Sequence, residues 1–105
     1  MHLRMHEPTW NIDVYDDGTT LYVTPVGELD VYTAPQLAEA LARLTDSHRA
    51  LILEVAELTF VDSTGLKVLA DAQRQEPERF MLSGESTALE RVLELADMAS
   101  HFRRV

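Results

Sequence analysis

Hydrophobic and polar positions alternate along the first part of the chain. In residues 10–15 every second side chain is apolar, which is typical of a half-buried β-strand. The same alternation returns in residues 21–26, after a turn signal at residues 16–19 that contains a glycine. The two segments are therefore predicted to pair as an antiparallel hairpin. Pro25 lacks a backbone N–H, so an irregular strand end is expected near it.

Three later stretches carry the spacing of amphipathic helices, with apolar residues three or four positions apart. These stretches are residues 37–44, 66–70 and 89–96. The sequences Thr-Ala-Pro-Gln at residues 33–36 and Thr-Ala-Leu-Glu at residues 87–90 have the spacing of a capping box, which predicts where the first and third helices begin. The second helix is expected to end before Pro77.

A nearly continuous apolar run, residues 51–55, fits a central strand that is covered on both faces. Leu58 and Phe60 alternate behind it, as its end or a short extension. Residues 80–82 and 102–105 are predicted to be further short strands. The order is then β-β-α-β-α-β-α-β, with the first pair antiparallel and right-handed helical crossovers between the others. This predicts a single α/β domain with a mixed sheet of four or five strands.

The chain has 105 residues and no cysteine. That length suits one domain, and we expect residues 1–8 to form a flexible tail and residues 9–105 the domain. The absence of cysteine excludes disulfides, thiolate zinc sites, iron–sulfur clusters and cysteine nucleophiles. His2 and His6 have a helical metal-ligand spacing, but they fall in the expected tail and no third ligand accompanies them. We therefore expect no metal and no cofactor.

Acidic residues outnumber basic ones by 18 to 9, and the formal net charge is -9. A domain of this charge repels phosphate backbones and anionic lipids, so neither nucleic acid nor a membrane surface is expected as a partner. No apolar run approaches the roughly 18–20 residues that span a bilayer. No apolar signal-peptide stretch follows the first charged residues. The sequence predicts a cytoplasmic domain.

The sharpest chemical feature is a group of three polar residues, Asp62, Ser63 and Thr64, between an apolar strand and a helix. Functional sites of α/β proteins gather at this carboxyl edge of the sheet. A phosphate on Ser63 would be stabilised there by the free N–H groups and partial positive charge of the helix start. The alternative is that Asp62 or Ser63 only caps the helix and Gly65 allows close packing, although both roles are compatible.

A second polar loop, residues 27–32, is expected between the second strand and the first helix. If that strand runs parallel to the third, both loops share one edge, and Glu28 and Asp30 come near Ser63. The alternative is a solvated acidic loop. As a surface-loop residue, Asp30 is expected to matter to a partner more than to stability. A serine hydrolase is disfavoured, because Val61 stands where a nucleophile elbow has glycine.

The two loops resemble the markers of the STAS domain family, which includes bacterial anti-sigma-factor antagonists and the cytoplasmic tails of sulfate transporters. The first marker is Asp-Ser-Thr-Gly-Leu at residues 62–66, which is similar to the family's Asp-Ser-Ser/Thr-Gly-Leu. The second is Gly-Glu-Leu-Asp at residues 27–30, followed by Thr33 and Ala34. The resemblance covers residues 10–105 and implies a single STAS-like domain.

The same resemblance implies a regulatory protein that is not an enzyme. It implies that Ser63 is phosphorylated by a partner anti-sigma factor with a histidine-kinase-like ATPase fold. The unphosphorylated chain would bind that partner and free a sigma factor, and a serine phosphatase would reset the switch. We expect a monomer or a weak dimer. The residues expected at the partner and switch surface are Glu28, Asp30, Thr33, Asp62, Thr64, Gly65 and Lys67.

Three positions depart from the family's pattern. Lys67 stands where a small residue is common, residues 75–78 replace a loop that often contains glycine, and residues 96–98 replace a Gly-Leu pair. These departures concern the C-terminal edge and the choice of partner more than Ser63.

Two alternatives to this function stay open. One is a STAS scaffold subunit of a signalling or lipid-transport complex, in which Ser63 is never phosphorylated. The more remote one is a small serine hydrolase.

Overall fold

Five strands and three helices make up the part of the chain that the computed structural model describes, residues 10–44 and 49–105. In chain order they are β1 (Trp10–Asp16), β2 (Thr20–Leu29), α1 (Ala34–Arg43), β3 (Ala50–Glu54), β4 (Leu58–Val61), α2 (Ser63–Gln75), β5 (Phe80–Ser83) and α3 (Thr87–Leu95). The expected tail, residues 1–8, lies outside the described residues, as do His2, His6 and His48.

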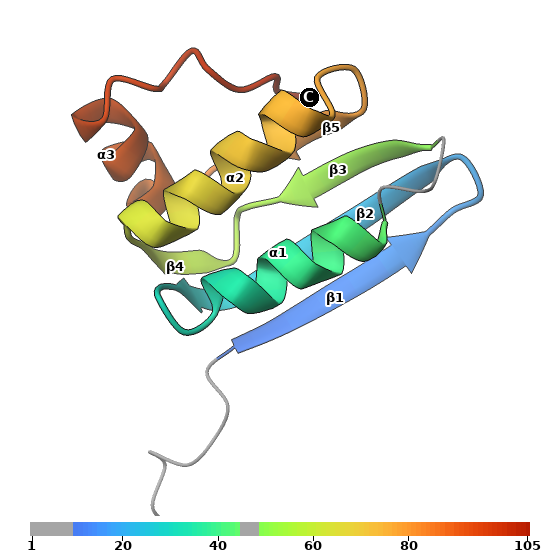
Figure 1. Ribbon diagram of the computed structural model, residues 1–105, viewed down its shortest axis with the longest axis horizontal. Helices are drawn as coiled ribbons and strands as arrows, with labels where there is room; N and C mark the ends of the chain where they lie inside the picture. The colour runs from blue at the N-terminus through green and yellow to red at the C-terminus, as the bar shows by residue number, and fades with distance from the viewer. Residues whose placement is uncertain (1–9, 45–48) are drawn as a thin grey trace, which may run out of the picture.

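The strands form one mixed sheet in the order β1-β2-β3-β5, and β4 pairs with the last part of β2 (Figure 1). β1 and β2 are antiparallel, with Trp10 opposite Gly27 and Asp16 opposite Leu21. The pairs β2–β3, β2–β4 and β3–β5 are parallel. The α/β fold, its N-terminal hairpin and its mixed five-stranded sheet are confirmed.

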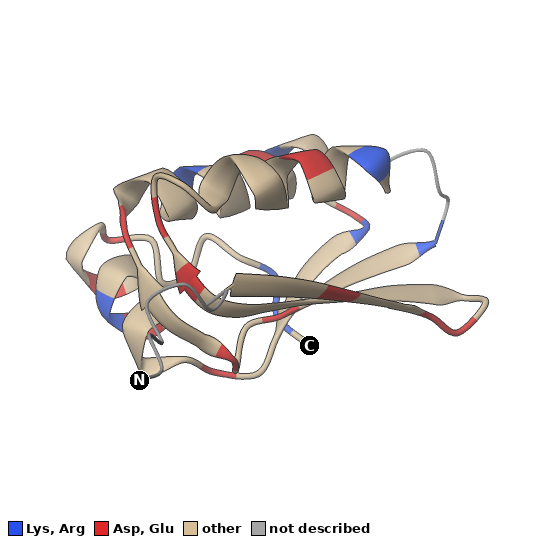
Figure 2. Ribbon diagram, turned by 90° about the horizontal axis from the view of Figure 1, so that it is seen from below, with Lys and Arg blue, Asp and Glu red and all other residues tan. Residues whose placement is uncertain are grey.

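Helices α1 and α2 pack against each other over one face of the sheet, and α3 packs beside β4 at one end (Figures 1 and 2). The apolar sides of these elements meet in one core, in which each buried leucine or phenylalanine contributes about 1.5–3 kcal/mol. Its largest fully buried side chains are Phe80, Leu29, Leu37, Leu51, Leu53, Leu69, Leu82, Leu89 and Leu93. Among the described helices, none is both long and apolar enough to cross a membrane.

Strand β4 is a separate strand and not the expected extension of the third strand. The chain turns after β3, where the N–H of Leu58 donates to the carbonyl of Val55 (3.1 Å), and then pairs with the far end of β2. A shift in the register of β2 changes which side chains of β4 face inward. Leu58 and Val61 are buried and Phe60 is exposed, so the expected alternation of Leu58 with Phe60 is wrong.

Strand β2 continues past Pro25 to Leu29, so the strand end expected near Pro25 is wrong, although the pairing register does shift close by, between Gly27 and Glu28. Neither β3 nor β4 pairs with residues 24–26 of β2, and no backbone donor is needed on that side. The strand continues to Leu29. The loop expected over residues 27–32 therefore shrinks to residues 30–33.

The helices lie where the pattern predicts them, but neither capping box forms. No side chain caps α1, because the hydroxyl of Thr33 donates to a strand carbonyl instead. The cap of α3 is Ser86, whose Oγ accepts from the N–H of Leu89 (3.2 Å). Helix α2 ends at Gln75, before Pro77 as expected.

The C-terminal strand expected over residues 102–105 is reduced to a single bridge between Leu82 of β5 and Arg104. The N–H of Leu82 donates to the carbonyl of Arg103 (2.9 Å), and Arg104 pairs with Glu90 of α3 (2.9 Å). These contacts tie the C-terminal residues to the outer edge of β5.

Candidate functional site

Strands β2 and β4 end side by side at one edge of the sheet. They are parallel, with Leu29 opposite Val61, and the N–H of Asp62 donates to the carbonyl of Leu29 (3.2 Å). Asp30 follows Leu29 as Asp62 follows Val61, so the loop before α1 and the start of α2 begin together (Figure 1). The structure thus brings the two predicted loops together, through β4 and not through β3.

Asp62 starts helix α2. Its backbone is extended, its Oδ1 accepts from the N–H of Gly65 (2.9 Å), and its carbonyl accepts from the N–H of Leu66 (2.9 Å). Ser63 is the first residue of the helix and Thr64 the second, and both are exposed. No hydrogen bond occupies the Ser63 hydroxyl within the described part of the chain. The capping role considered for Asp62 is therefore real, and it leaves the Ser63 hydroxyl open to solvent.

Gly65 allows the start of α2 to lie directly on β2. A Cβ atom at this position would fall 2.5 Å from Cγ of Leu29 and 3.0 Å from its carbonyl oxygen. Leu29 is fully buried, so its branched side chain has no free space into which it could withdraw. The close packing proposed for Gly65 is present, and it fixes the height of Ser63 above the sheet.

Asp30 and Thr33 hold the loop before α1 in a tight turn. Oδ1 of Asp30 accepts from the backbone N–H groups of Tyr32 (2.9 Å) and Thr33 (3.0 Å). The buried hydroxyl of Thr33 donates to the carbonyl of Glu28 (2.7 Å) and accepts from the N–H of Asp30 (2.8 Å). Asp30 is therefore a structural residue of the loop as well as a surface residue, and the expectation that its truncation costs little stability stays a prediction to be tested.

Large apolar side chains are exposed beside these polar groups. Val31 is 55% exposed, Tyr32 80% and Phe60 47%. Phe60 lies opposite Glu28, which is also exposed. The sequence pattern does not indicate that these three residues are exposed surface residues. Phe60 is expected to face the core, and in the loop that holds Val31 and Tyr32 only the acidic residues are singled out. We call the whole surface the carboxyl edge: Glu28, Asp30, Val31, Tyr32, Phe60, Asp62, Ser63 and Thr64.

Lys67 is the positively charged residue nearest in sequence to Ser63. The two residues are four positions apart in α2 and therefore share one face of the helix. The exposed ammonium of Lys67 pairs with Asp71 one further turn along (3.0 Å), which keeps it close to the helix surface. Among the expected site residues, Lys67 thus lies beside the carboxyl edge, while Gly65 and Thr33 lie beneath it.

Hydrogen bonds hold the pKa of Asp30 below its ordinary value. The N–H of Thr33 has the largest effect, burial opposes it, and the N–H of Tyr32 and the hydroxyl of Thr33 lower the pKa further. A carboxylate whose pKa is depressed by folding stabilises the folded state above its unfolded pKa, and this stabilisation is lost as the pH falls through the folded pKa. We therefore expect the free energy of unfolding to fall below about pH 4, and to fall less steeply in Asp30→Asn.

Urea unfolding at neutral pH and at steps below about pH 4 measures this effect. Asn can still accept the two backbone N–H groups through its amide oxygen, so Asp30→Asn removes the charge and keeps the turn. Asp13→Asn, at an exposed position of β1, is the matched control. Identical acid profiles for the parent and Asp30→Asn would contradict the expectation.

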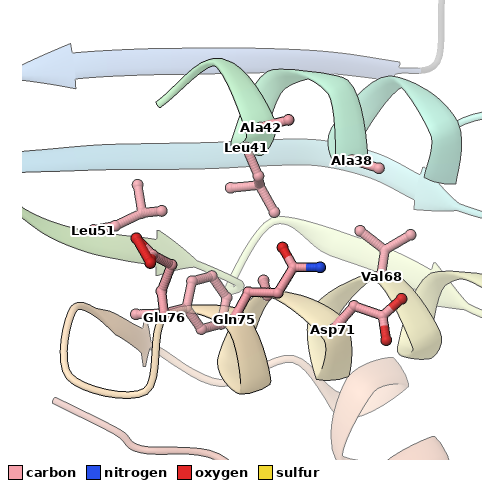
Figure 3. Close-up of a pocket in the computed structure, with 10 residues that line it drawn as sticks. Ala38, Leu41, Ala42, Leu51, Val68, Asp71, Gln75 and Glu76 are labelled. Atoms are coloured by element: carbon pink, nitrogen blue, oxygen red, sulfur yellow. The ribbon is translucent and has the colours of Figure 1, made fainter. Parts of the chain in front are cut away.

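A cavity of about 220 Å³ lies between α1 and α2, away from the carboxyl edge (Figure 3). Leu41, Leu51 and Phe80 give it an apolar lining, and Asp71 and Glu76 stand at its rim. Both carboxylates already pair with basic residues of α2 or of the loop that follows it. None of the expected site residues lines the cavity, so we assign it no part in the chemistry of Ser63.

Among the described residues, no general base is hydrogen-bonded to the Ser63 hydroxyl. No histidine hydrogen-bonds to Ser63 within residues 10–44 and 49–105, and Asp62 Oδ1 is engaged with Gly65. Within the same residues, no group of three histidine, aspartate or glutamate side chains is placed to hold a metal ion. The arrangement is suited to something else: an exposed hydroxyl at a helix N-terminus that can accept a phosphate.

Comparison with known protein families and sequences gives a consistent result. The profile of the STAS domain family matches residues 11–104. An anti-sigma-B factor antagonist of Bacillus subtilis is 38% identical over 58 residues, which cover 55% of this chain and 53% of the relative. The namesake of Listeria monocytogenes is 34% identical over 77 residues, covering 70% of this chain and 68% of the relative. The match thus spans about half the length of the first relative.

Solved structures show the same fold. An anti-sigma factor antagonist from Mycobacterium paratuberculosis superposes with a TM-score of 0.79 at 28% identity, over 90% of this chain and 84% of that one. The anti-sigma factor antagonist SpoIIAA in its unphosphorylated form superposes with a TM-score of 0.71 at 17% identity, over 90% and 88% of the two chains. At that identity the second likeness concerns the fold alone.

Proposed function

The chain belongs to the STAS domain family, and on this premise we propose that it is an anti-sigma-factor antagonist of the cytoplasm. In its unphosphorylated form it binds an anti-sigma factor and thereby releases a sigma factor. The anti-sigma factor is also a serine kinase with a histidine-kinase-like ATPase fold, and it ends the interaction by phosphorylating Ser63. A serine phosphatase restores the binding form. The chain is a kinase substrate and a binding protein, not an enzyme.

The position of Ser63 carries this proposal. Its hydroxyl is exposed, free of hydrogen bonds among the described residues, and set at the first position of a 13-residue helix. Asp62 caps that helix with its own side chain, so the Ser63 hydroxyl is not needed to hold the fold together. A phosphate placed there faces solvent and the free N–H groups of the helix start. The site can therefore change its charge without rebuilding the core.

The remainder of the carboxyl edge supports its use as a docking surface. Val31, Tyr32 and Phe60 offer exposed apolar contact area around Ser63, and aromatic side chains of this kind often anchor protein interfaces. Glu28 and Asp30 add negative charge beside them. We propose that the anti-sigma factor covers this surface and places its kinase site over Ser63.

Ser63, and not Thr64, is expected to accept the phosphate. Both hydroxyls are exposed and adjacent, but Ser63 directly follows the cap at the first helical position, whereas Thr64 lies further into the first turn. The protein is incubated with the candidate anti-sigma factor and ATP, and intact-mass and phosphopeptide spectra are recorded. Ser63→Ala should abolish the mass gain of one phosphate, and Thr64→Ala should retain it.

Thr64→Ala is also the matched control for folding, because it removes the neighbouring exposed hydroxyl from the same helical turn. If phosphate incorporation survives in Ser63→Ala and disappears in Thr64→Ala, the assignment of the acceptor is wrong. If neither variant nor the parent gains a phosphate while the parent still binds the anti-sigma factor, the kinase part of the proposal fails and the binding part stands.

A further inference from the structure

The face of the sheet opposite α1 and α2 carries no described helix over its longer half. Figure 2 shows the sheet edge-on, with both helices above it and none beneath the half that ends at the turn between β1 and β2. Parallel strands are usually covered on both faces. Residues 51–55 have the nearly continuous apolar pattern of such a strand, yet only Leu51, Leu53 and Val55 are fully buried, while Ile52 and Glu54 are partly exposed. The lack of a described helix over this half of the sheet therefore needs an explanation.

Four large side chains form a row across this open face. Register places Tyr15 opposite Tyr22, Tyr22 beside Ile52, and Ile52 beside Met81, so the row crosses β1, β2, β3 and β5. Residues paired across strands point to the same side of a sheet. Leu21, Leu51 and Phe80, the preceding neighbours of three of them, are buried on the helix side. The row accordingly points away from the core.

The row is accessible and apolar. Tyr15 is 65% exposed, and its ring lies 6.1 Å from that of Tyr22, centroid to centroid. Tyr22, Ile52 and Met81 are partly exposed. Apolar side chains that are contiguous on an exposed surface mark an interaction site more often than single ones do. The four side chains of the row are contiguous and accessible in this way.

The charged residues that the strands place on this face are acidic. Asp13 of β1 and Glu54 of β3 lie two positions from the row on their strands, so they point to the same side as Tyr15 and Ile52. None of the five strands contains a lysine or an arginine. The open face thus combines an apolar row with acidic flanks, which complements an apolar surface with basic flanks.

We propose that the open face, formed by Asp13, Tyr15, Tyr22, Ile52, Glu54 and Met81, is a second docking surface, and that it takes a basic amphipathic helix of another protein. A helix that lays its apolar stripe on the face covers the sheet in the manner of α/β proteins. Its lysine or arginine residues then meet Asp13 and Glu54. A second copy of this chain fits less well, because its acidic flanks would meet their own equivalents.

This surface is distinct from the carboxyl edge. Ser63 begins α2, which lies over the opposite face of the sheet. Ser63 itself therefore stays uncovered when the open face is occupied, and the inference does not rest on the proposed function. In every variant below, loss of peptide binding at the open face can be measured separately from loss of anti-sigma-factor binding or phosphorylation at the carboxyl edge.

The probe is a synthetic amphipathic peptide, with a leucine stripe flanked by lysine and arginine, titrated into the full-length, isotope-labelled chain. A scrambled peptide of the same composition is the control probe. Amide chemical shifts should move at Tyr15, Tyr22, Ile52 and Met81, and not at Ser63. Ile52→Thr, which keeps a β-branched residue in the strand, should weaken binding by about tenfold or more without changing the melting temperature by much.

Charge-reversal variants test whether the acidic residues of the open face attract the basic peptide, or whether the net negative charge of the whole chain does. Asp13→Lys/Glu54→Lys should weaken binding of the peptide by about tenfold. Glu85→Lys/Glu94→Lys makes the same change of net charge at exposed positions outside the open face, and should leave binding nearly unchanged.

Three outcomes would overturn the proposal. In the first, no shifts appear on the open face at millimolar peptide. In the second, both double variants weaken binding equally, so that only net charge matters. In the third, sedimentation of the chain alone shows a dimer that Ile52→Thr dissociates, which would assign the face to a second copy.

Discussion

Phosphate on Ser63 is expected to weaken binding of the anti-sigma factor by roughly tenfold to more than a hundredfold, while the domain stays folded. The phosphate adds about 1.5–2 negative charges beside Asp62 and in the neighbourhood of Asp30 and Glu28. Unit charges roughly 6 Å apart interact by about 2–3 kcal/mol at an effective dielectric constant near 20. The helix N-terminus offsets about 0.3–1 kcal/mol of this repulsion.

Solvent decides how this repulsion divides between folding and binding. In the free protein Ser63 is exposed, so water hydrates the phosphate and the Asp62 cap can remain in place. In the proposed complex the partner covers the carboxyl edge, so the added charge would be hydrated less well. Binding should therefore lose about 1.4–3 kcal/mol, and the fold should lose much less.

Calorimetric titration of the phosphorylated and unphosphorylated chains against the anti-sigma factor measures the loss, and amide NMR spectra of both forms report on the fold. Ser63→Asp and Ser63→Asn are a matched pair, because they differ in charge and hardly in size. Equal affinities of the two forms would remove the switch. Spectral changes spread over the whole domain would replace local exclusion by a conformational mechanism.

Gly65→Val is expected to destabilise the domain by about 3 kcal/mol, at the upper end of the usual range for overpacked cores. The first added atom already falls 2.5 Å from Cγ of Leu29, and the Leu29 carbonyl oxygen lies at 3.0 Å. Neither can move freely, because Leu29 is buried and its carbonyl accepts from the N–H of Asp62. Gly65→Ala should also destabilise, although alanine favours a helix interior over glycine by about 1 kcal/mol.

Chemical unfolding of the variants tests this expectation. Thr64→Val is the matched control: it adds a β-branched apolar residue in the same helical turn at an exposed position, and should change stability by less than about 0.5 kcal/mol. Gly65→Ala and Leu29→Ala should be non-additive, since Leu29→Ala removes the two side-chain atoms that the new Cβ meets and leaves only the carbonyl oxygen at 3.0 Å. Additive effects, or a stabilised Gly65→Ala, would show that the close approach is not a constraint.

Much of this arrangement could be predicted from the sequence, because period-two and helical spacing report directly on which side of an element is buried. The hairpin, the three helices and the meeting of the two loops all follow from such patterns. Strand β4 could not be separated from β3, since the turn at residues 55–57 contains neither glycine nor proline. The exposure of Phe60 depends on the register in which β4 pairs with β2. The sequence of neither strand alone determines that register.

The caps show a second limit. Thr33 has the residue type and spacing of a helix cap, yet its hydroxyl binds the carbonyl of Glu28, which only the folded loop brings within reach. Ser86 was one position away from the predicted start, and it also donates to the carbonyl of Leu58, 28 residues earlier in the chain. A hydroxyl with a choice between local and distant partners cannot be assigned from local sequence.

Strand β2 divides the domain into parts of unequal resistance to opening. It is held by β1 along one side and by β3, then β4, along the other, so its amide protons outside residues 24–26 should exchange with solvent only when the whole domain unfolds. β4 pairs with no strand except β2 among those described, over a short stretch, and can detach at a smaller free-energy cost. Ser63 follows β4 directly. Ser63 therefore follows a strand that has a single described partner strand, while the central strand β2 keeps the remainder folded.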